Sequence, residues 1–248
     1  MPDPGDDHPG QTRVMVLRRP AAPFVAFQKR EFMLPEREVA PCVLALADDP
    51  DGLGRFTGYE RDTAHIRDML VCTHGARDAC CATFGYPIYR ELRESWASDT
   101  LRVWRASHIG GHRFAPTLID LPEGRTWGHL DQRLAAQIVQ RTGSVFEVSR
   151  CCRGWAGVTA PFEQVAEREI LRRKGWEWLG YGKRGETLAT SDDGTSADVR
   201  ISFQNADATE SGAYEARVEV VGTVPTGGCS GEGGEAPQYR VRQLDRVS

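Results

Sequence analysis

The sequence predicts an α/β protein whose middle part alternates strands and helices. Residues 68–143 are predicted to form, in order, a strand, a cysteine-containing loop, a helix, a strand, a histidine-containing loop, a strand pair and a helix. This alternation is typical of domains in which helices pack on the faces of a sheet. A β-rich region, residues 13–67, precedes this part, and a mixed α+β region, residues 144–248, follows it. We therefore expect one central α/β domain with an N-terminal and a C-terminal extension.

The N-terminal region begins with a tail and continues with strands. Residues 1–12 are acidic, rich in proline and glycine, and contain no apolar segment, so they predict a disordered tail and not a signal peptide. The runs 13–19 and 24–30 are rich in β-forming residues, which predicts a hairpin. The short apolar run 42–47 predicts a buried strand.

Three helices are predicted from apolar spacing and end signals. Residues 83–97 carry apolar side chains at helical spacing, with Pro87 expected in the first turn. Residues 131–143 begin with a capping aspartate and end with a glycine, and residues 161–175 begin with a proline and also end with a glycine. Strands are predicted at the remaining apolar runs: 66–73, 101–107, the two arms around the turn at 122–124, 176–181, 197–203, 214–222 and 239–244.

Composition limits the classes of function. Of the 248 residues, 40% are hydrophobic and 27% charged, and the net charge is −4, which argues against a dedicated nucleic-acid-binding protein. No run of 18 apolar residues occurs, so no membrane span is expected. The seven cysteines include two adjacent pairs, which does not suit a secreted disulfide framework. We expect a reducing, cytoplasmic setting, where clustered thiols are more often metal ligands or redox groups.

Two loops carry the residues that predict chemistry. Cys72 ends a predicted strand, and Cys80 and Cys81 follow in the loop that leads to the next helix. His108 and His112 follow the next strand. Because the ends of neighbouring parallel strands lie at the same edge of a sheet, we expect the two loops to meet there. Two thiolates and two imidazoles form a donor set that suits Zn²⁺ or an iron–sulfur centre.

The spacing of the thiols favours a [2Fe–2S] cluster over zinc. Zinc sites usually supply thiolates from a tight C-x₂₋₄-C unit, whereas Cys72 lies eight positions before Cys80 and nine before Cys81. A cluster with two irons needs two ligand pairs, one for each iron. Gly110 and Gly111, between the histidines, would let backbone N–H groups approach the bridging sulfides without a Cβ clash.

Other functions use the same residues. A zinc-stabilised structural or interaction module is one alternative, and a thiol-redox enzyme of thioredoxin type that uses Cys72 or the Cys80–Cys81 pair is another. The C-x-x-C motif of thioredoxin chemistry is missing, which weakens the second alternative. A Rieske centre is excluded because no histidine closely follows Cys80 and Cys81, although His74 follows Cys72.

Two long motifs resemble the sucrase/ferredoxin-like family, whose members carry thioredoxin-like [2Fe–2S] domains. They are CTHGARDACCA at 72–82 and HIGGHRFAPTLIDLPEG at 108–124. The resemblance covers about residues 13–174 and includes RGWAGVTAPFEQVAE at 153–167. It implies a thioredoxin-like ferredoxin domain at 68–143. The word sucrase implies no glycosidase chemistry, and the sequence contains no carboxylate pair that supports it.

The resemblance also implies a ligand set, because some members bind the cluster through two cysteines and two histidines. The matching residues here are Cys72, Cys81, His108 and His112. Cys80 is the rival to Cys81. Imidazole ligands are neutral, so such a cluster has a higher potential than one held by four thiolates.

One-electron transfer is the function that the resemblance implies. The chain is then an electron carrier rather than an enzyme, and its partner is a reductase or another oxidoreductase protein. Neither a nucleic acid nor a membrane is expected as a partner. Arg77 is a candidate for tuning the cluster through its charge. Cys151, Cys152 and Cys229 are not expected to be ligands.

Overall fold

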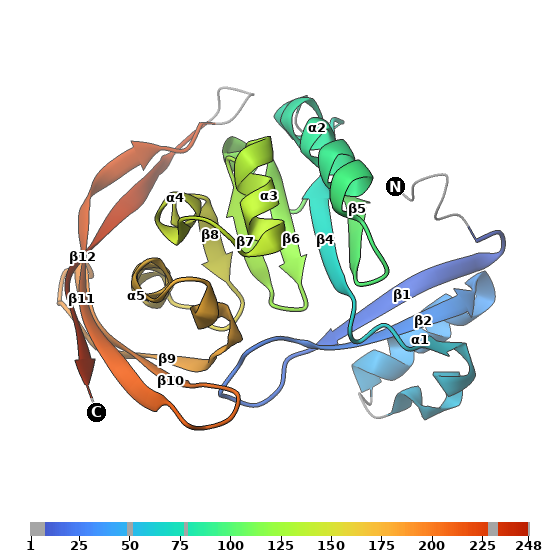
Figure 1. Cartoon of the computed structure of the whole chain (residues 1–248), viewed down its shortest axis with the longest axis horizontal. Helices are drawn as coiled ribbons and strands as arrows, with labels where there is room; N and C mark the ends of the chain where they lie inside the picture. Colours follow the sequence, from blue (N-terminus) through green and yellow to red (C-terminus); the bar gives the residue numbers. More distant parts are fainter. Residues whose placement is uncertain (1–7, 49–51, 77–78, 228–232, 248) are drawn as a thin grey trace.

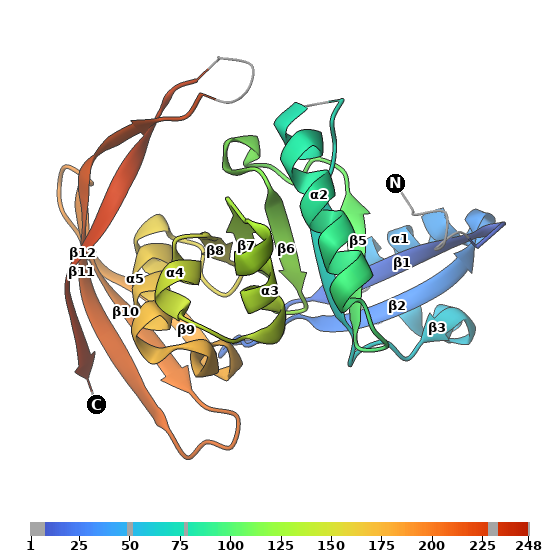
Figure 2. The same cartoon turned by 45° about the horizontal axis from the view of Figure 1, so that its top comes forward.

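Three β-sheets and the helices between them make up the described part of the protein. The computed structural model describes residues 8–48, 52–76, 79–227 and 233–247. Both views show a central sheet flanked on one side by an N-terminal hairpin and on the other by a C-terminal sheet (Figures 1 and 2). None of the helices in the described part of the chain is long and apolar enough to cross a membrane.

The central sheet has five strands in the order β5-β4-β6-β7-β8. Its strands are β4 (Arg67–Cys72), β5 (Leu101–Ala106), β6 (Thr117–Leu121), β7 (Arg125–Gly128) and β8 (Cys152–Trp155). β4 and β5 are parallel and are connected by α2 (Ala79–Trp96), whereas all other neighbours are antiparallel. Helix α3 (Gln132–Gln140) follows the β6–β7 hairpin and packs beside α2 (Figure 1). This order of elements is that of the thioredoxin fold, so the predicted fold class is confirmed.

The predicted start of α3 and both predicted ends of α5 are confirmed, whereas α3 ends at Gln140, with Arg141 as its left-handed cap, and not at the predicted glycine. The Asp131 carboxylate accepts a hydrogen bond of 2.7 Å from the backbone N–H of Leu134 and caps α3. Helix α5 (Pro161–Lys174) begins at the predicted proline, and Gly175 follows its last residue. The strand pair predicted around residues 122–124 is the β6–β7 hairpin.

Helix α2 begins earlier than predicted. Its first residue is Ala79, so the cysteine pair lies in the first turn of the helix and not in a preceding loop. Pro87 lies inside the helix, although it was expected in the first turn. Proline has no N–H, so the carbonyl of Thr83 has no donor at the usual helical position. The buried side chains of α2 pack against β4 and β5 and hold the helix in place.

The N-terminal unit is a small sheet with its own core. Its strands are β1 (Gln11–Arg18), β2 (Gln28–Pro35) and β3 (Glu60–Arg61), and the β1–β2 pair is the predicted hairpin. A helix, α1 (Glu36–Asp48), and a 3-10 helix, η2 (Gly52–Tyr59), cover this sheet. The core consists of five side chains: Phe32, Leu34, Cys42, Leu53 and Phe56.

The strand predicted at 42–47 is wrong, because these residues belong to α1. The apolar run is not buried on both sides. Cys42 is fully buried, whereas Val43 and Leu44 are 51% and 62% exposed. A short apolar run cannot by itself distinguish a strand from a helix, and here one side of the run faces solvent.

The C-terminal unit is a four-stranded antiparallel sheet in the order β12-β11-β10-β9. The strands are β9 (Gly182–Thr190), β10 (Ser196–Gln204), β11 (Ser211–Pro225) and β12 (Glu235–Val247). Helix α5 lies between this sheet and β8, with the short helix α4 (Val145–Ser149) beside it (Figure 2). Residues 176–181, predicted as a strand, include the 3-10 helix η4 (Trp176–Gly180), in which Trp178 is fully buried.

Buried ion pairs fasten both flanking units to the central sheet. Lys29 of β2 binds Asp68 of β4 at 2.6 Å. The Arg102 guanidinium of β5 contacts both Asp68, at 2.7 Å, and Glu31 of β2, at 2.5 Å. The charged neighbours hold the pKa values of Glu31 and Asp68 below their usual range, against the opposing effect of burial. Both carboxylates therefore stay ionised inside the protein.

A second buried cluster joins the C-terminal sheet. Arg125 of β7 binds Glu167 of α5 at 2.7 Å, and the Lys183 ammonium of β9 lies 3.6 Å from the same carboxylate. Lys183 also donates to the backbone carbonyl of Trp178 at 2.7 Å. Burial lowers the pKa of Lys183 to about 8. These contacts and a shared hydrophobic core make the central and C-terminal sheets one packed body.

Candidate metal centre

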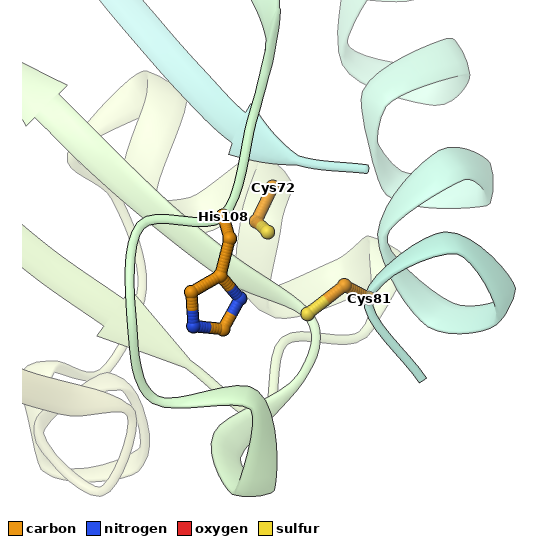
Figure 3. Close-up of side chains that lie close together, drawn as sticks. All are labelled: Cys72, Cys81 and His108. Carbon is orange, nitrogen blue, oxygen red and sulfur yellow. The ribbon is translucent and has the colours of Figure 1, made fainter. Parts of the chain in front are cut away.

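Two thiols and one imidazole converge at the end of β4. The ligand atoms of Cys72, Cys81 and His108 all lie within 4.8 Å of one another. Cys72 is the last residue of β4, Cys81 lies in the first turn of α2, and His108 lies in the loop after β5. Figure 3 shows the three side chains pointing toward a common point from these three segments. This donor set suits a soft or borderline metal, either Zn²⁺ or an iron–sulfur centre.

Close packing of α2 on the end of β4 sets the separation of the two thiols. A Cβ atom at Gly85 would lie 2.0 Å from the carbonyl oxygen of Cys72. Gly75 is also confined, because a Cβ there would lie 2.8 Å from the Cβ of Ala82. The first turns of α2 thus rest directly on the strand end that carries Cys72. One signal in the sequence could have pointed to Gly85, since a glycine inside a helix costs about 1 kcal/mol and usually has a packing reason.

The loop between the histidines turns through two glycines. Gly110 and Gly111 have φ angles of 86° and 68°, a left-handed backbone that favours glycine. A Cβ at Gly110 would meet nothing within 4 Å. The left-handed backbone accounts for glycine at Gly110, and the expected approach of this backbone to bridging sulfides stays a prediction.

His112 lies near the three converging side chains but outside their group. It begins the 3-10 helix η3 (His112–Phe114), and its ring centroid is 6.1 Å from that of His108. Within the described residues, the structure therefore brings three of the four predicted ligands together and leaves the fourth beside them.

The site is buried on its sulfur side and open on its nitrogen side. Cys72 and Cys81 are fully buried, whereas His108 and His112 are half-buried. A metal centre held by these residues would therefore be shielded by the core at its thiolates and would reach the surface at its imidazoles.

The other cysteines have different surroundings. Among the described residues, the group around Cys72 includes Cys81 and not its neighbour Cys80, which is 6% exposed. The Cys151 thiol donates to the backbone carbonyl of His129 at 3.6 Å, and burial raises the pKa of Cys151. Cys152 accepts a hydrogen bond of 3.5 Å from Arg125. These contacts make Cys151 and Cys152 part of the core. Arg77 and Cys229 lie outside the described residues.

An arginine–aromatic cluster adjoins the histidine loop, and the sequence did not point to it. Phe114, two residues after His112, lies against Gly111 and has the guanidinium groups of Arg113 and Arg153 each 4.5 Å from its ring centroid. Arg153 also lies 3.2 Å from Nδ1 of His129. The partners are up to 40 residues apart in the chain, so spacing along the sequence carried no signal.

The comparisons with known proteins agree with the motifs. The profile of the sucrase/ferredoxin-like family matches residues 9–154. The chain belongs to this family. The region after residue 154, with α5 and the C-terminal sheet, lies outside the match. No curated protein matches the chain.

Solved structures of a ferredoxin are similar to part of this chain. The thioredoxin-like [2Fe–2S] ferredoxin from Aquifex aeolicus is 14% identical, with a TM-score of 0.32, over 40% of this chain and 97% of that chain. A cysteine-to-serine variant of the same ferredoxin is 15% identical, with a TM-score of 0.31, over 36% of this chain and 99% of that chain.

Proposed function

We propose that this protein is a one-electron carrier whose [2Fe–2S] cluster is bound by two cysteines and two histidines. The proposed ligands are Cys72, Cys81, His108 and His112. The observation that carries the proposal is the convergence of two thiols and an imidazole from three separate segments within 4.8 Å. Membership of the ferredoxin-like family supports the same reading.

The burial of these residues suits electron transfer. When bound, the cluster supplies reversible one-electron oxidation and reduction. The buried thiols of Cys72 and Cys81 would exclude water from one side of the cluster. The half-buried imidazoles of His108 and His112 would form its solvent side, where a partner can approach. We propose a reductase or another oxidoreductase protein as that partner, and a cytoplasmic setting.

A zinc module is the second candidate, and one observation favours it. Three ligand atoms within 4.8 Å of one another are close enough to be drawn onto a single ion. Zinc would then hold β4, α2 and the histidine loop together without redox chemistry. The same four residues would serve both metals, so ligand identity alone does not separate the two functions.

Anaerobic purification followed by a visible spectrum and metal analysis separates them. A cluster gives a red-brown protein with about two irons and about two sulfides per chain. A colourless protein with about one zinc per chain would instead establish the structural module. A protein that takes up neither metal under reconstitution with iron, sulfide or zinc would contradict both proposals.

Variants then test the ligand set on the purified protein. Cys81→Ser is expected to lose the visible absorption, whereas Cys80→Ser, the matched neighbour, retains it. Replacing both His108 and His112 by alanine should also abolish the absorption. A His112→Cys variant should keep a cluster but lower its potential, because a thiolate adds negative charge. Unchanged spectra in the Cys81 or double-histidine variants would refute the assignment.

A further inference from the structure

Four arginines lie along the edge of the central sheet that carries the candidate metal centre. We call them the cationic rim: Arg105, Arg113, Arg150 and Arg153. The chain as a whole is acidic, with a net charge of −4. Yet the segments nearest the site contain no aspartate or glutamate: 72–76, 79–90, 105–117 and 127–130. The neighbouring carboxylates are engaged elsewhere, because Asp131 caps α3 and Glu147, which lines the same hollow as Arg150, is in an ion pair with Arg133. Arg77 and Asp78, outside the described residues, carry formal charges that cancel.

Two rim arginines are linked to the site by contacts, and a third by its position in the chain. Arg105 lies 3.4 Å from the hydroxyl of Thr73, the residue after Cys72. Arg113 directly follows His112. Arg153 stacks on Phe114, which in turn lies against Gly111 of the histidine loop.

The rim guanidinium groups keep their charge available. Within the described ranges, none of the four arginines is in an ion pair with a carboxylate. By contrast, the central-sheet arginines Arg67, Arg102 and Arg125 are all in ion pairs, with Asp120, Glu31 and Glu167 as partners. Arg113 and Arg150 are exposed. Unpaired exposed cations beside a redox site attract an anionic surface and speed its approach.

Exposed aromatic side chains complete the surface. Phe84 and Tyr86 of α2 are 54% and 45% exposed, within one to two turns of Cys81. The Arg105 guanidinium lies 5.6 Å from the ring centroid of Tyr86. Aromatic residues and arginine are enriched in protein–protein interfaces. An exposed aromatic ring beside an arginine therefore indicates an interface more strongly than an isolated exposed ring does. Charge and exposed aromatic surface therefore coincide at Tyr86, whereas Phe84, two residues earlier, lies on another flank of α2.

We propose that the cationic rim, with Tyr86, is the docking surface for a redox protein whose contact face is rich in carboxylates. This inference rests on the proposed electron-transfer function. The electron would pass at the imidazole side of the centre, on the edge of the sheet along which the rim lies. The transfer moves one electron and neither forms nor breaks a covalent bond.

Two small oxidants of opposite charge test the electrostatics. The dithionite-reduced protein, freed of excess dithionite, is mixed with hexacyanoferrate(III) or with hexaamminecobalt(III), each of which takes one electron. The rate with the anionic oxidant should fall as salt is added, and the rate with the cationic oxidant should rise. Coulomb's law at ~10 Å with screening at ~0.1 M salt gives about a five-fold change in rate for each Arg→Glu substitution.

The variants are chosen so that a change in potential is distinguishable from a change in docking. Arg113→Glu and Arg150→Glu should slow the anionic oxidant and speed the cationic one, whereas an altered potential would move both rates in the same direction. Arg184→Glu, at an exposed position on β9, is the matched control and should change neither rate. Rates that do not respond to salt or to the rim substitutions would overturn the proposal.

A binding measurement tests the class of partner without electron transfer. A fluorescently labelled oligoglutamate peptide should bind the wild type and lose about five-fold in affinity for each rim substitution. A single-stranded oligonucleotide of equal charge should bind no more tightly. Tighter binding of the oligonucleotide would assign the surface to nucleic acid and overturn the proposal. If the protein holds no cluster, the proposed function fails first; if it holds one without charge discrimination, only the docking surface fails.

Discussion

Replacing Gly85 by alanine should separate the two thiols of the candidate centre. The new Cβ would lie 2.0 Å from the carbonyl oxygen of Cys72 and 3.2 Å from its carbonyl carbon. Ordinary contacts begin at 3.4 Å. Helix α2 and the end of β4 must therefore move apart by about 1.4 Å, and both contacting atoms belong to backbone that cannot rotate away. Metal–ligand distances tolerate only about 0.2 Å, so Cys72 and Cys81 would no longer bind one centre together.

The helix propensity of alanine and the steric clash change the free energy of unfolding in opposite directions, and the clash should be the larger effect. Alanine gains about 1 kcal/mol over glycine in a helix. Overpacking typically costs about 1–3 kcal/mol, and the upper end applies because two backbone segments must shift. A net loss of about 2 kcal/mol corresponds to a fall of about 4–8 °C in melting temperature for a chain of this size.

The assay combines thermal unfolding with iron bound per chain after anaerobic reconstitution. Gly58→Ala is the matched control, because a Cβ at Gly58 of η2 would meet nothing within 4 Å. The control should keep its metal and its melting temperature. If the Gly85→Ala protein matched the control in both measurements, the packing of α2 on β4 would not set the ligand geometry, and the reasoning would be wrong.

Three further predictions concern the buried charges. Glu167→Gln leaves the buried Arg125 without its countercharge and should cost about 3–5 kcal/mol in the free energy of unfolding, measured by denaturant titration. Lys183 has its pKa lowered to about 8 by burial, so the unfolded chain binds more protons between pH 8 and its usual value of 10.5. Its contribution to stability should therefore rise with pH across that window, by about 3 kcal/mol, and this rise should be absent in Lys183→Met. Glu31 and Asp68 have lowered pKa values, so the stability that they provide is present above about pH 4 and is lost as the pH falls through their folded pKa values. Acid unfolding of Glu31→Gln should therefore show a shallower pH dependence than that of the wild type.

Local signals predicted the elements that depend on local chemistry. The capping aspartate Asp131 and the terminal Gly175 fixed the ends of α3 and α5, because these residues satisfy or release backbone groups at helix ends. Pro87 misled the placement of α2, since proline usually marks a first turn and here lies inside the helix. The run at 42–47 was misassigned because the sequence does not show which of its side chains pack against the small N-terminal core and which face solvent.

The candidate site was predictable in composition but not in shape. The spacing of Cys72, Cys81 and His108 at strand ends predicted that they would meet, and their ligand atoms do lie within 4.8 Å. The contact of Gly85 with Cys72 and the stacking of Arg153 on Phe114 involve partners far apart in the chain. Such contacts follow from the packed structure and not from a sequence period.

The two flanking units are attached at one edge of the central sheet, and the candidate centre lies at the other. Asp68 and Arg102, which hold the N-terminal hairpin, are the second residues of the parallel strands β4 and β5, whereas Cys72 and His108 lie at or after the ends of those strands. Arg125, which binds Glu167 of α5, is the first residue of β7. In the strand register it lies opposite Asp120 of β6, and Asp120 lies opposite Met69 near the start of β4. A buried ion pair is satisfied only in one geometry, so these ion pairs hold the N-terminal and C-terminal units at the opposite edge of the sheet. The edge that carries the cysteines and histidines therefore stays uncovered. Substitutions in the ion pairs should accordingly change the stability of the fold and leave the visible spectrum and the charge preference of electron transfer unchanged.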